Sequence, residues 1–421
     1  MAEYPKIFLQ REKEQGIKKK RHPWLFSHSI SGTEGADKGT GNIPNGGIVD
    51  VYLSDRKTFF GRGYFNHHSQ IRVRLLTRDV SEMIDGIFFE RRLSALFEMR
   101  KSFINEKETN AYRIVFGESD SLPGLILDRY GDVYVLQIHT AGMDALKPVL
   151  IPAILKVFKP KTLYERSDVN VRLQEGLKEC PRQHLFGEKI TGEIKILENG
   201  IPFYVDVVHG QKTGFFLDQR ENRKALQKYS SGRTVLNCFS YTGGFSVYAA
   251  LAGARSVTSV DVSKDALETA KRNFTLNNIR VGGTQVKHEV VEEDVFDYLD
   301  SLLKKKSLEL KGSQNPKPFD LIILDPPAFV KNQKTLKNGL AGYLKINEMA
   351  IRLLPSNGIL ITSSCSSRVT DEMFQETLTL AFHRTATNVK VLEIRHQPLD
   401  HPFNPDFPEG KYLKFWVCLK G

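Results

Sequence analysis

Two reactive side chains follow apolar runs in the C-terminal half of the 421-residue sequence. Asp325 ends the run LIILD and precedes two prolines, and Cys365 ends the run GILITSSC. Proline cannot extend a strand ladder and stiffens a turn, so Asp325 would be presented rigidly. If both runs are neighbouring parallel strands, their carboxyl ends meet at one edge of the sheet. The sequence therefore predicts a carboxylate beside a sulfur nucleophile.

A cysteine in this position suits methylation of an electron-poor pyrimidine carbon. Its thiolate adds to C6 of the base, and C5 then becomes nucleophilic enough to take a methyl group. A base removes the C5 proton and the thiolate is eliminated. Cations or a helix N-terminus would favour the thiolate, and Arg368 and a helix beginning near Thr370 are the candidates. The alternative is that Cys365 is a small buried residue, the usual role of a free cysteine.

A glycine turn upstream predicts a nucleoside-binding site. The segment Leu236–Ser246, LNCFSYTGGFS, runs from an apolar strand through small residues into a helix. Gly243 and Gly244 allow a ligand to approach the backbone closely. The spacing is not G-x-G-x-x-G, which argues against a nicotinamide dinucleotide. The residues of the turn expected to bind the cofactor are Asn237, Phe239, Tyr241, Thr242 and Gly243.

Three carboxylates end the strands that should surround this turn. Asp261 follows it at the spacing of about 20 residues typical of a carboxylate that accepts ribose hydroxyls. Asp294 could accept the adenine amino group, cap the following helix, or do both. Asp325 could contact the ammonium of a methionine moiety or the edge of a base. A simple Asp-Pro turn is the structural alternative for Asp325.

A parallel sheet with helices on both faces would bring these residues together. From about residue 194, strand-like runs alternate with helical patterns, an order typical of α/β proteins. The strand-like runs are TVLNCF, SVTSVDV, FDLIILD and GILITSSC. Two final runs, VLEIRHQP and YLKFWVCL, have no helix between them, which favours an antiparallel pair at one edge.

Two smaller regions precede this sheet. Residues 1–76 consist of short apolar runs between glycines, which predicts a small β-barrel or sandwich. Its run KKKRHPW pairs cations with an aromatic that could stack on a base, although a solvated turn explains the run equally well. Residues 77–193 combine the helical pattern GIFFERRLSALFEMRKSF with strand-like pieces, which predicts an α+β module.

The composition limits the classes of function. The net charge of +11 should attract polyanions such as nucleic acid, although a merely basic protein would show the same surplus. The four cysteines, Cys180, Cys238, Cys365 and Cys418, show neither metal-ligand spacing nor a disulfide framework, so we expect no metal. No apolar stretch approaches membrane-spanning length and the charged N-terminus lacks a signal-peptide core, so we expect a cytoplasmic protein.

Several of these motifs resemble one known family, the RlmI-type ribosomal RNA large-subunit cytosine-C5 methyltransferases. The resemblance rests on LNCFSYTGGFSVYAALAGA, VDVS, DPPAFVKN, GYLKINEMAIRLL, ILITSSCS and DHPFNPDFPEGKYLK. The run REKEQGIKKKRHPWLFSHSI looks like the family's N-terminal PUA domain. FGESDSLPGLILDRYGD and YERSDVNVRLQEGL are similar to its central domain. The resemblance covers nearly the whole chain.

This resemblance implies a PUA-like RNA-binding domain over 1–76, a central α+β domain over 77–193, and a class I, Rossmann-like methyltransferase domain over 194–421. It implies S-adenosyl-L-methionine (SAM) as the methyl donor, a cytosine in large-subunit (23S) rRNA as the acceptor, and a homodimer. In GQKTGFFLDQRENR it implies that Gln219 and Arg220 contact the cofactor. It also implies that Cys365 is the nucleophile and that Asp325 holds the edge of the base.

The sequence also departs from the family and leaves rival functions open. Cys238 stands where a bulkier apolar residue is usual, and Ala328 stands where lysine is common. No second cysteine follows the prolines, so Cys365 would act alone. Uracil-C5 methylation follows the same nucleophile logic, whereas methylation of a guanine nitrogen would leave Cys365 without a role. A non-catalytic RNA-binding or ribosome-assembly protein is the remaining alternative.

Overall fold

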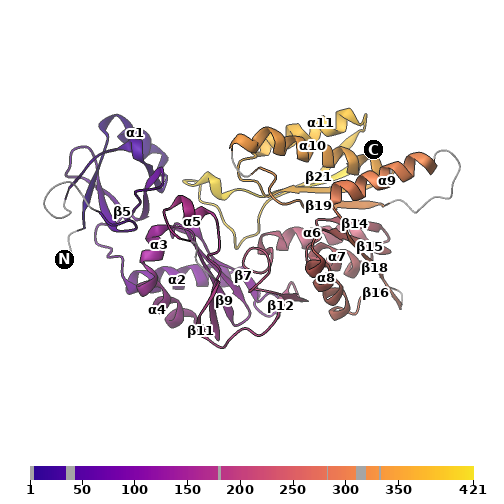
Figure 1. Cartoon of the computed structure of the whole chain (residues 1–421), viewed down its shortest axis with the longest axis horizontal. Coiled ribbons are helices and arrows are strands. Elements are labelled where there is room, and N and C mark those ends of the chain that lie inside the picture. The colour runs from indigo at the N-terminus through magenta and orange to yellow at the C-terminus, as the bar shows by residue number, and fades with distance from the viewer. Residues whose placement is uncertain (1–3, 35–42, 179–181, 282, 310–318, 331–332) are drawn as a thin grey trace. The chain divides into compact units, whose positions relative to one another are not determined.

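The computed structural model describes residues 4–34, 43–178, 182–281, 283–309, 319–330 and 333–421 (Figure 1). The chain forms two compact units. Unit 1 comprises Met1–Leu197, Val205–Leu217 and Leu399–Gly410, and unit 2 comprises Glu198–Tyr204, Asp218–Pro398 and Lys411–Gly421. Unit 1 thus holds both N-terminal regions, and the boundaries between the three expected domains stay predictions.

The N-terminal part of unit 1 is β-rich, as expected. Its six-stranded sheet has the order β2-β6-β5-β4-β1-β3 and is antiparallel except for the pairing of β1 with β4. Alternating side chains such as Ile7, Leu9, Val49 and Val51 are buried in one hydrophobic core. The elements are β1 Lys6–Leu9, α1 Arg11–Lys20, β2 Trp24–Phe26, β3 Ile30–Glu34, β4 Ile48–Tyr52, β5 Phe59–Phe65 and β6 Ile71–Thr77.

The rest of unit 1 is the expected α+β module. Its five-stranded sheet has the order β11-β10-β9-β8-β7. Asp85 caps the N-terminus of α2 by accepting the N–H of Phe88 at 2.9 Å. The elements are α2 Gly86–Lys101, β7 Ala111–Phe116, β8 Leu125–Tyr130, β9 Val133–Ile138, α3 Ala141–Ala145, α4 Lys147–Phe158, β10 Thr162–Glu165, α5 Val171–Gln174 and β11 Gln183–Gly187. A two-stranded sheet of β12 Ile194–Glu198 and β13 Ile201–Val205 follows in the chain and spans the unit boundary after Leu197.

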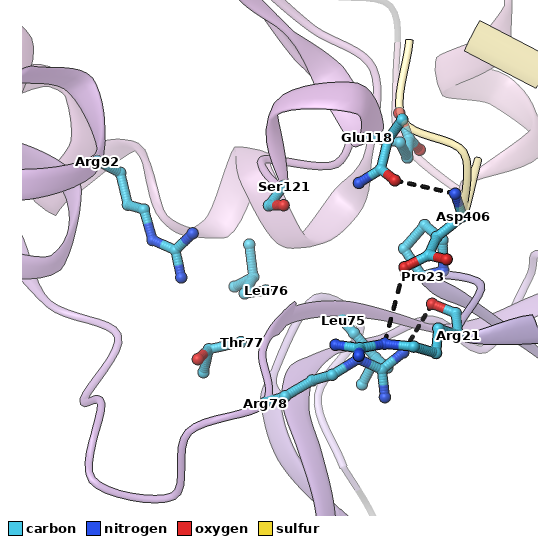
Figure 2. A pocket seen from close by; sticks show the side chains of 11 residues that line it. Arg21, Pro23, Leu75, Leu76, Thr77, Arg78, Arg92, Glu118, Ser121 and Asp406 are labelled. Carbon is cyan, nitrogen blue, oxygen red and sulfur yellow. Dashed lines mark hydrogen bonds and ion pairs between the residues drawn. The ribbon is translucent and has the colours of Figure 1, made fainter. Parts of the chain in front are cut away.

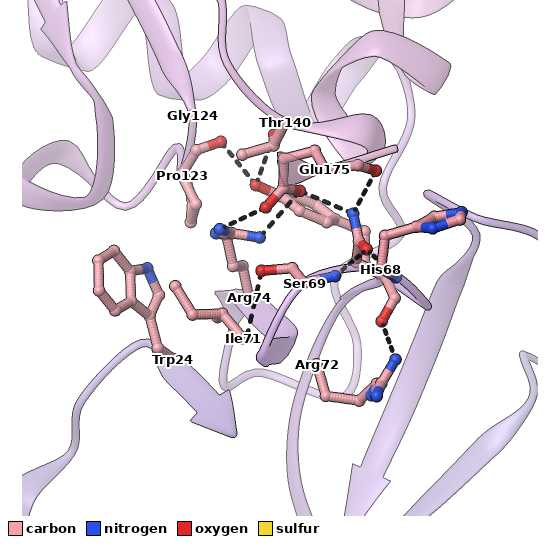
Figure 3. Close-up of polar contacts among 12 residues, drawn as sticks. Trp24, His68, Ser69, Ile71, Arg72, Arg74, Pro123, Gly124, Thr140 and Glu175 are labelled. Carbon is pink, nitrogen blue, oxygen red and sulfur yellow. Dashed lines mark hydrogen bonds and ion pairs between the residues drawn. The ribbon is translucent and has the colours of Figure 1, made fainter. Parts of the chain in front are cut away.

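A buried polar network joins the two parts of unit 1 (Figure 3). Arg74 of β6 donates to both carboxylate oxygens of Glu175, at 2.8 and 3.1 Å. Asn66 donates to the same side chain at 2.7 Å, and Tyr64 donates to the carbonyl of Pro123 at 2.8 Å. Both members of the ion pair are almost fully buried, so each neutralises a charge that water cannot reach.

Unit 1 also holds the proline-rich segment Leu399–Gly410. The carboxylate of Asp400 accepts the backbone N–H of Arg113 at 2.9 Å, and its carbonyl accepts Arg100 at 3.2 Å. The ring of His401 is buried against Phe116, with centroids 5.3 Å apart. These contacts fasten the segment to strand β7 and to the end of helix α2.

Unit 2 confirms the parallel sheet. Its strand order is β18-β15-β14-β19-β20-β22-β21, with parallel pairing from β18 to β20. The last two strands are antiparallel and lie at one edge, as predicted. The order reverses between β14 and β19, which is where ligands of such sheets bind. The strands are β14 Thr234–Cys238, β15 Ser256–Asp261, β18 Lys287–Glu292, β19 Leu321–Leu324, β20 Ile359–Ser364, β21 Val389–Arg395 and β22 Lys414–Lys420.

Helices cover both faces of this sheet (Figure 1). Helix α7 contacts α6 and α8 on one face, and α10 contacts α9 and α11 on the other. Helix α9 ends with the run KKKSLE, and residues 310–318 lie outside the described part. The helices are α6 Arg220–Ser230, α7 Gly244–Leu251, α8 Lys264–Leu276, α9 Val295–Glu309, α10 Leu336–Leu353 and α11 Asp371–Arg384. Within the described residues, no helix is long and apolar enough to cross a membrane.

The Glu175→Ala variant should lower the free energy of unfolding of unit 1 by about 3–5 kcal/mol, because it leaves the buried charge of Arg74 uncompensated. Urea unfolding followed by fluorescence measures this change. Glu90 forms a surface ion pair with Lys156, so the control Glu90→Ala should cost about 0–1 kcal/mol. Equal midpoints for the two variants would contradict a role for the buried pair.

Candidate active site

The glycine turn after β14 has an unusual backbone conformation. Phe239, Tyr241 and Gly243 have positive φ angles of 57°, 47° and 77°. A Cβ added at Gly243 would lie 2.9 Å from the Cβ of Ala270, closer than real contacts allow. Non-glycine residues with positive φ are uncommon and collect at functional sites. Only glycine fits at the start of α7 without displacing α8.

Buried polar atoms of the same turn lack partners. The side-chain oxygens of Asn237, Ser240 and Thr242 are buried and accept no hydrogen bond from any described residue. The amide of Asn237 donates to Ser246 at 2.9 Å, and a chain of contacts continues from Ser246 to Ser259 and His288. Burial lowers the pKa of His288 to about 4, so its ring is neutral at pH 7. Unsatisfied buried oxygens are costly, and a ligand carrying N–H and O–H donors would satisfy them.

The carboxylates predicted around the turn occupy the strand ends. Asp261, at the end of β15, accepts the backbone N–H groups of Tyr241 and Ser263, each at 2.9 Å. Each oxygen keeps a second lone pair for a hydroxyl donor. Asp294 follows β18 and accepts the N–H groups of Phe296 and Asp297, so its predicted role as a helix cap is confirmed. Its predicted contact with adenine stays a prediction.

Asp325 lies at the end of β19 among polar side chains. Its Oδ1 accepts Nε2 of Gln219 at 2.8 Å and also the hydroxyl of Ser363. Burial is the largest influence on this carboxyl and raises its pKa to about 6, although the two hydrogen bonds oppose the shift. A carboxylate held in this way would gain stability from a ligand cation.

Gln219 and Arg220 begin helix α6 close to Asp325. Gln219 is held by Asn222, whose amide donates to its Oε1 at 2.7 Å. Arg220 is buried, and its Nε donates to Glu221 at 3.1 Å. The structure therefore brings Gln219 to the predicted site, and Arg220 forms a hydrogen bond with Glu221 of its own helix. Contact of either residue with a cofactor stays a prediction.

Cys365 lies one residue beyond β20, beside the Asp-Pro-Pro turn. Its Sγ is 3.9 Å from the carbonyl oxygen of Pro326, and the side chain is partly exposed. Because β19 and β20 pair in parallel, Asp325 and Cys365 leave the same edge of the sheet. Cys238 and Cys418 are buried, which raises the pKa of both thiols and is typical of cysteines with a structural role. Cys180 lies outside the described residues.

A buried lysine that the sequence analysis missed holds the loop after Cys365. The ammonium of Lys414 donates to the carbonyls of Ser366, Val369 and Tyr412 at 2.6–2.7 Å. Burial lowers its pKa to about 8, and the charges of Asp371 and Cys365 oppose that shift. The cation expected beside Cys365 was Arg368, whose side chain is exposed.

Comparison with known proteins agrees with this geometry. A family model described as S-adenosylmethionine-dependent methyltransferase matches residues 177–410, and a PUA-like domain model matches residues 7–78. Proteins named ribosomal RNA large subunit methyltransferase I are 39% identical in Pseudoalteromonas translucida and 40% identical in Aeromonas salmonicida. The alignments cover 98% of each chain in the first case and 97% in the second.

The chain belongs to this methyltransferase family. Solved structures agree: a candidate SAM-dependent methyltransferase from Streptococcus mutans is 27% identical, with a TM-score of 0.79 over 99% of this chain and 100% of that one. Another candidate methyltransferase, solved with S-adenosylhomocysteine (SAH), has a TM-score of 0.80 at 27% identity and the same coverage. The chain is therefore a SAM-dependent enzyme, and its unsatisfied oxygens and carboxylates fit a ligand with hydroxyl, amino and ammonium donors.

If Asp325 holds the ligand's ammonium, the affinity of this methyltransferase for SAH should fall as the pH drops below about 6, because protonation removes the negative charge of Asp325. Titration calorimetry between pH 5 and 8 measures this dependence. Asp325→Asn should bind weakly at every pH. The control Asp297→Asn changes an exposed carboxylate of α9 and should keep the wild-type profile. A flat wild-type profile would exclude a charge-based role for Asp325.

The same carboxyl has a second consequence, for stability. Its folded pKa lies above the ordinary value of 3.8, so its contribution to stability is greatest below that value and is lost as the pH rises through about 6.

Lys414→Met should reduce methyl transfer by about 100-fold while SAH affinity is preserved. The variant loses the three hydrogen bonds through which Lys414 holds the loop after Cys365. Iodoacetamide labelling of Cys365, quantified by mass spectrometry, should also slow as the nearby cation disappears. Lys420 holds two carbonyls farther along β22 and provides the matched control, Lys420→Met. Wild-type labelling and turnover in Lys414→Met would disprove the positioning role.

Proposed function

We propose that this methyltransferase modifies C5 of a cytosine in large-subunit ribosomal RNA through a covalent bond between Cys365 and C6. The observation that carries the proposal is the partly exposed thiol beside the Asp-Pro-Pro turn, with Sγ 3.9 Å from the carbonyl of Pro326. The full-length relatives are named for ribosomal RNA of the large subunit, which supports the acceptor. Methylation at an amino nitrogen would give this thiol no role.

The chain's residues divide the reaction between them. The thiolate of Cys365 forms a bond to C6, and the electron pair of the C5–C6 double bond moves toward C5. SAM, when bound, would supply the methyl group that C5 attacks, and the electrons of the broken S–CH3 bond would stay with sulfur as SAH leaves. A base then removes the C5 proton, the double bond re-forms, and the thiolate leaves with the electrons of the C6–S bond. Lys414 favours the thiolate form and fixes the loop that carries it.

The cofactor would lie over the glycine turn at the switch point of the sheet. Asp261 would accept ribose hydroxyls, and Asp294 would meet the adenine amino group. Asp325, with Gln219 beside it, would hold either the methionine ammonium or the edge of the base. The other proposed cofactor contacts are Arg220, Asn237, Phe239, Tyr241, Thr242 and Gly243.

We further propose that the enzyme works as a homodimer in the cytoplasm. Strand β21 is at the edge of the seven-stranded sheet, and its Val391, Leu392 and Ile394 are exposed apolar side chains, which supports self-association. The net charge of +11 supports a nucleic acid as the acceptor. We expect that catalysis needs no metal ion.

Cys365→Ala should abolish methyl transfer yet bind SAH with wild-type affinity, because the thiol enters only the covalent steps. Bisulfite sequencing of large-subunit RNA incubated with SAM should show one new protected cytosine for the wild type and none for the variant. RNA carrying fluorine at the target C5 should trap the wild type covalently. A base cannot abstract fluorine from C5 as it abstracts a proton, so the thiolate cannot be eliminated. Full activity in Cys365→Ala would disprove the covalent mechanism, and label transfer without protected cytosine would indicate uracil.

A further inference from the structure

A basic cavity lies in unit 1, and none of its lining residues belongs to the candidate active site (Figure 2). Its volume is about 200 Å³, whereas a water molecule in the liquid occupies about 30 Å³. Three arginines line it: Arg21 after helix α1, Arg78 after strand β6, and Arg92 on helix α2. Figure 2 shows Arg78 beside Arg21, with Arg92 apart from both. The cavity is large enough for a phosphate group with part of its sugar.

Arg78 carries a charge that no carboxylate of the described residues neutralises at ion-pair distance. It donates to two backbone carbonyls, of Arg21 at 2.8 Å and of Phe60 at 3.5 Å, and its guanidinium lies 4.6 Å from the centre of the Phe60 ring. Burial and the neighbouring Arg21 lower the pKa of Arg78, whereas the charge of Asp406 raises it. An anion in the cavity would act on Arg78 in the same direction as Asp406.

The two carboxylates at the cavity are already engaged. Glu118 accepts the indole N–H of Trp24 at 2.9 Å and lies 3.8 Å from Arg74. Asp406 lies 3.7 Å from Arg21. On the far wall, Arg92 is 3.2 Å from Glu82 and is partly neutralised. Arg78, with the exposed Arg21 beside it, therefore forms the anion-attracting side of the cavity.

Aromatic rings that suit a nucleic acid follow on the adjoining strand. Pro23 lines the cavity, and strand β2 continues through Trp24 to Phe26. The indole of Trp24 is packed against Phe407, with centroids 5.0 Å apart. Phe26, in contrast, is 37% exposed and stacks on the exposed ring of His28 at an interplanar angle of 16°. Phosphate-binding cations beside an exposed ring are typical of single-stranded RNA sites.

We infer that the cavity of Arg78 and Arg21 binds a phosphodiester of the substrate RNA, while a neighbouring base stacks on Phe26. The inference rests on the proposed function, because it places a second contact of the same RNA on the PUA-like part of the chain. An arginine fork offers paired donors that match two phosphate oxygens. The segment Leu399–Gly410 contributes one wall through Asn404 and Asp406.

Binding of a single-stranded rRNA fragment, measured by fluorescence anisotropy at several KCl concentrations, tests the inference. Arg78→Gln should weaken binding about tenfold at low salt. It should also reduce the slope of log affinity against log salt by about 0.7, the value for one lost phosphate contact on a single strand. Phe26→Ala should weaken binding without changing the slope, because stacking releases no counterion. Arg91→Gln, which removes an exposed arginine of α2 that does not line the cavity, is the matched control.

The outcomes separate this inference from the proposed function. A wild-type enzyme that methylates the RNA, with an Arg78→Gln variant of unchanged affinity and slope, overturns the phosphate site and leaves the proposed function intact. A loss of affinity with an unchanged slope, accompanied by a lower melting temperature, shows a structural role for Arg78 and also overturns the site. An unchanged affinity of the Phe26→Ala variant for RNA would overturn the proposed stacking of a base on Phe26. A wild type that neither methylates nor binds the RNA contradicts the proposed function itself.

Discussion

The parallel pairing of β19 with β20 is the constraint on which the chemistry depends. Their register sets Leu324 opposite Thr362, so the residues that follow each strand leave the sheet at the same edge. Ser363 reaches back to Asp325 across this pair, and the Sγ of Cys365 faces the carbonyl of Pro326. Shifting either strand by one residue would turn one of these side chains to the other face. Buried Leu and Ile side chains on both strands fix the register.

The same burial sets the protonation of the groups at this edge. Desolvation raises the pKa of Asp325 and lowers that of Lys414, so each is held closer to neutrality than in water. Both are compensated by dipoles: a hydroxyl and an amide for the carboxylate, and three carbonyls for the ammonium. Fixed dipoles need no rearrangement during a reaction, so the edge stays organised while charge moves between thiol and base.

Much of this arrangement was predictable from the sequence, because it follows from local periodicity. The alternating strands and helices of unit 2, the terminal antiparallel pair and the cap formed by Asp294 all depend on short segments. Lys414 was not predictable, because its partners Ser366 and Val369 are distant in the sequence and become neighbours only through the antiparallel pairing of β20 with β22. The pairing of Arg74 with Glu175 likewise joins residues that no sequence pattern connects.

The division of the chain into two units has a consequence for its evolution and its engineering. The backbone passes from one unit to the other five times, after Leu197, Tyr204, Leu217, Pro398 and Gly410. No single cut therefore yields either unit whole, and a gene fragment ending before Leu399 would lack the segment whose Asp400 holds strand β7. Neither unit can be transferred to another protein as one continuous segment. Sequence changes in one unit have therefore had to remain compatible with the fold of the other.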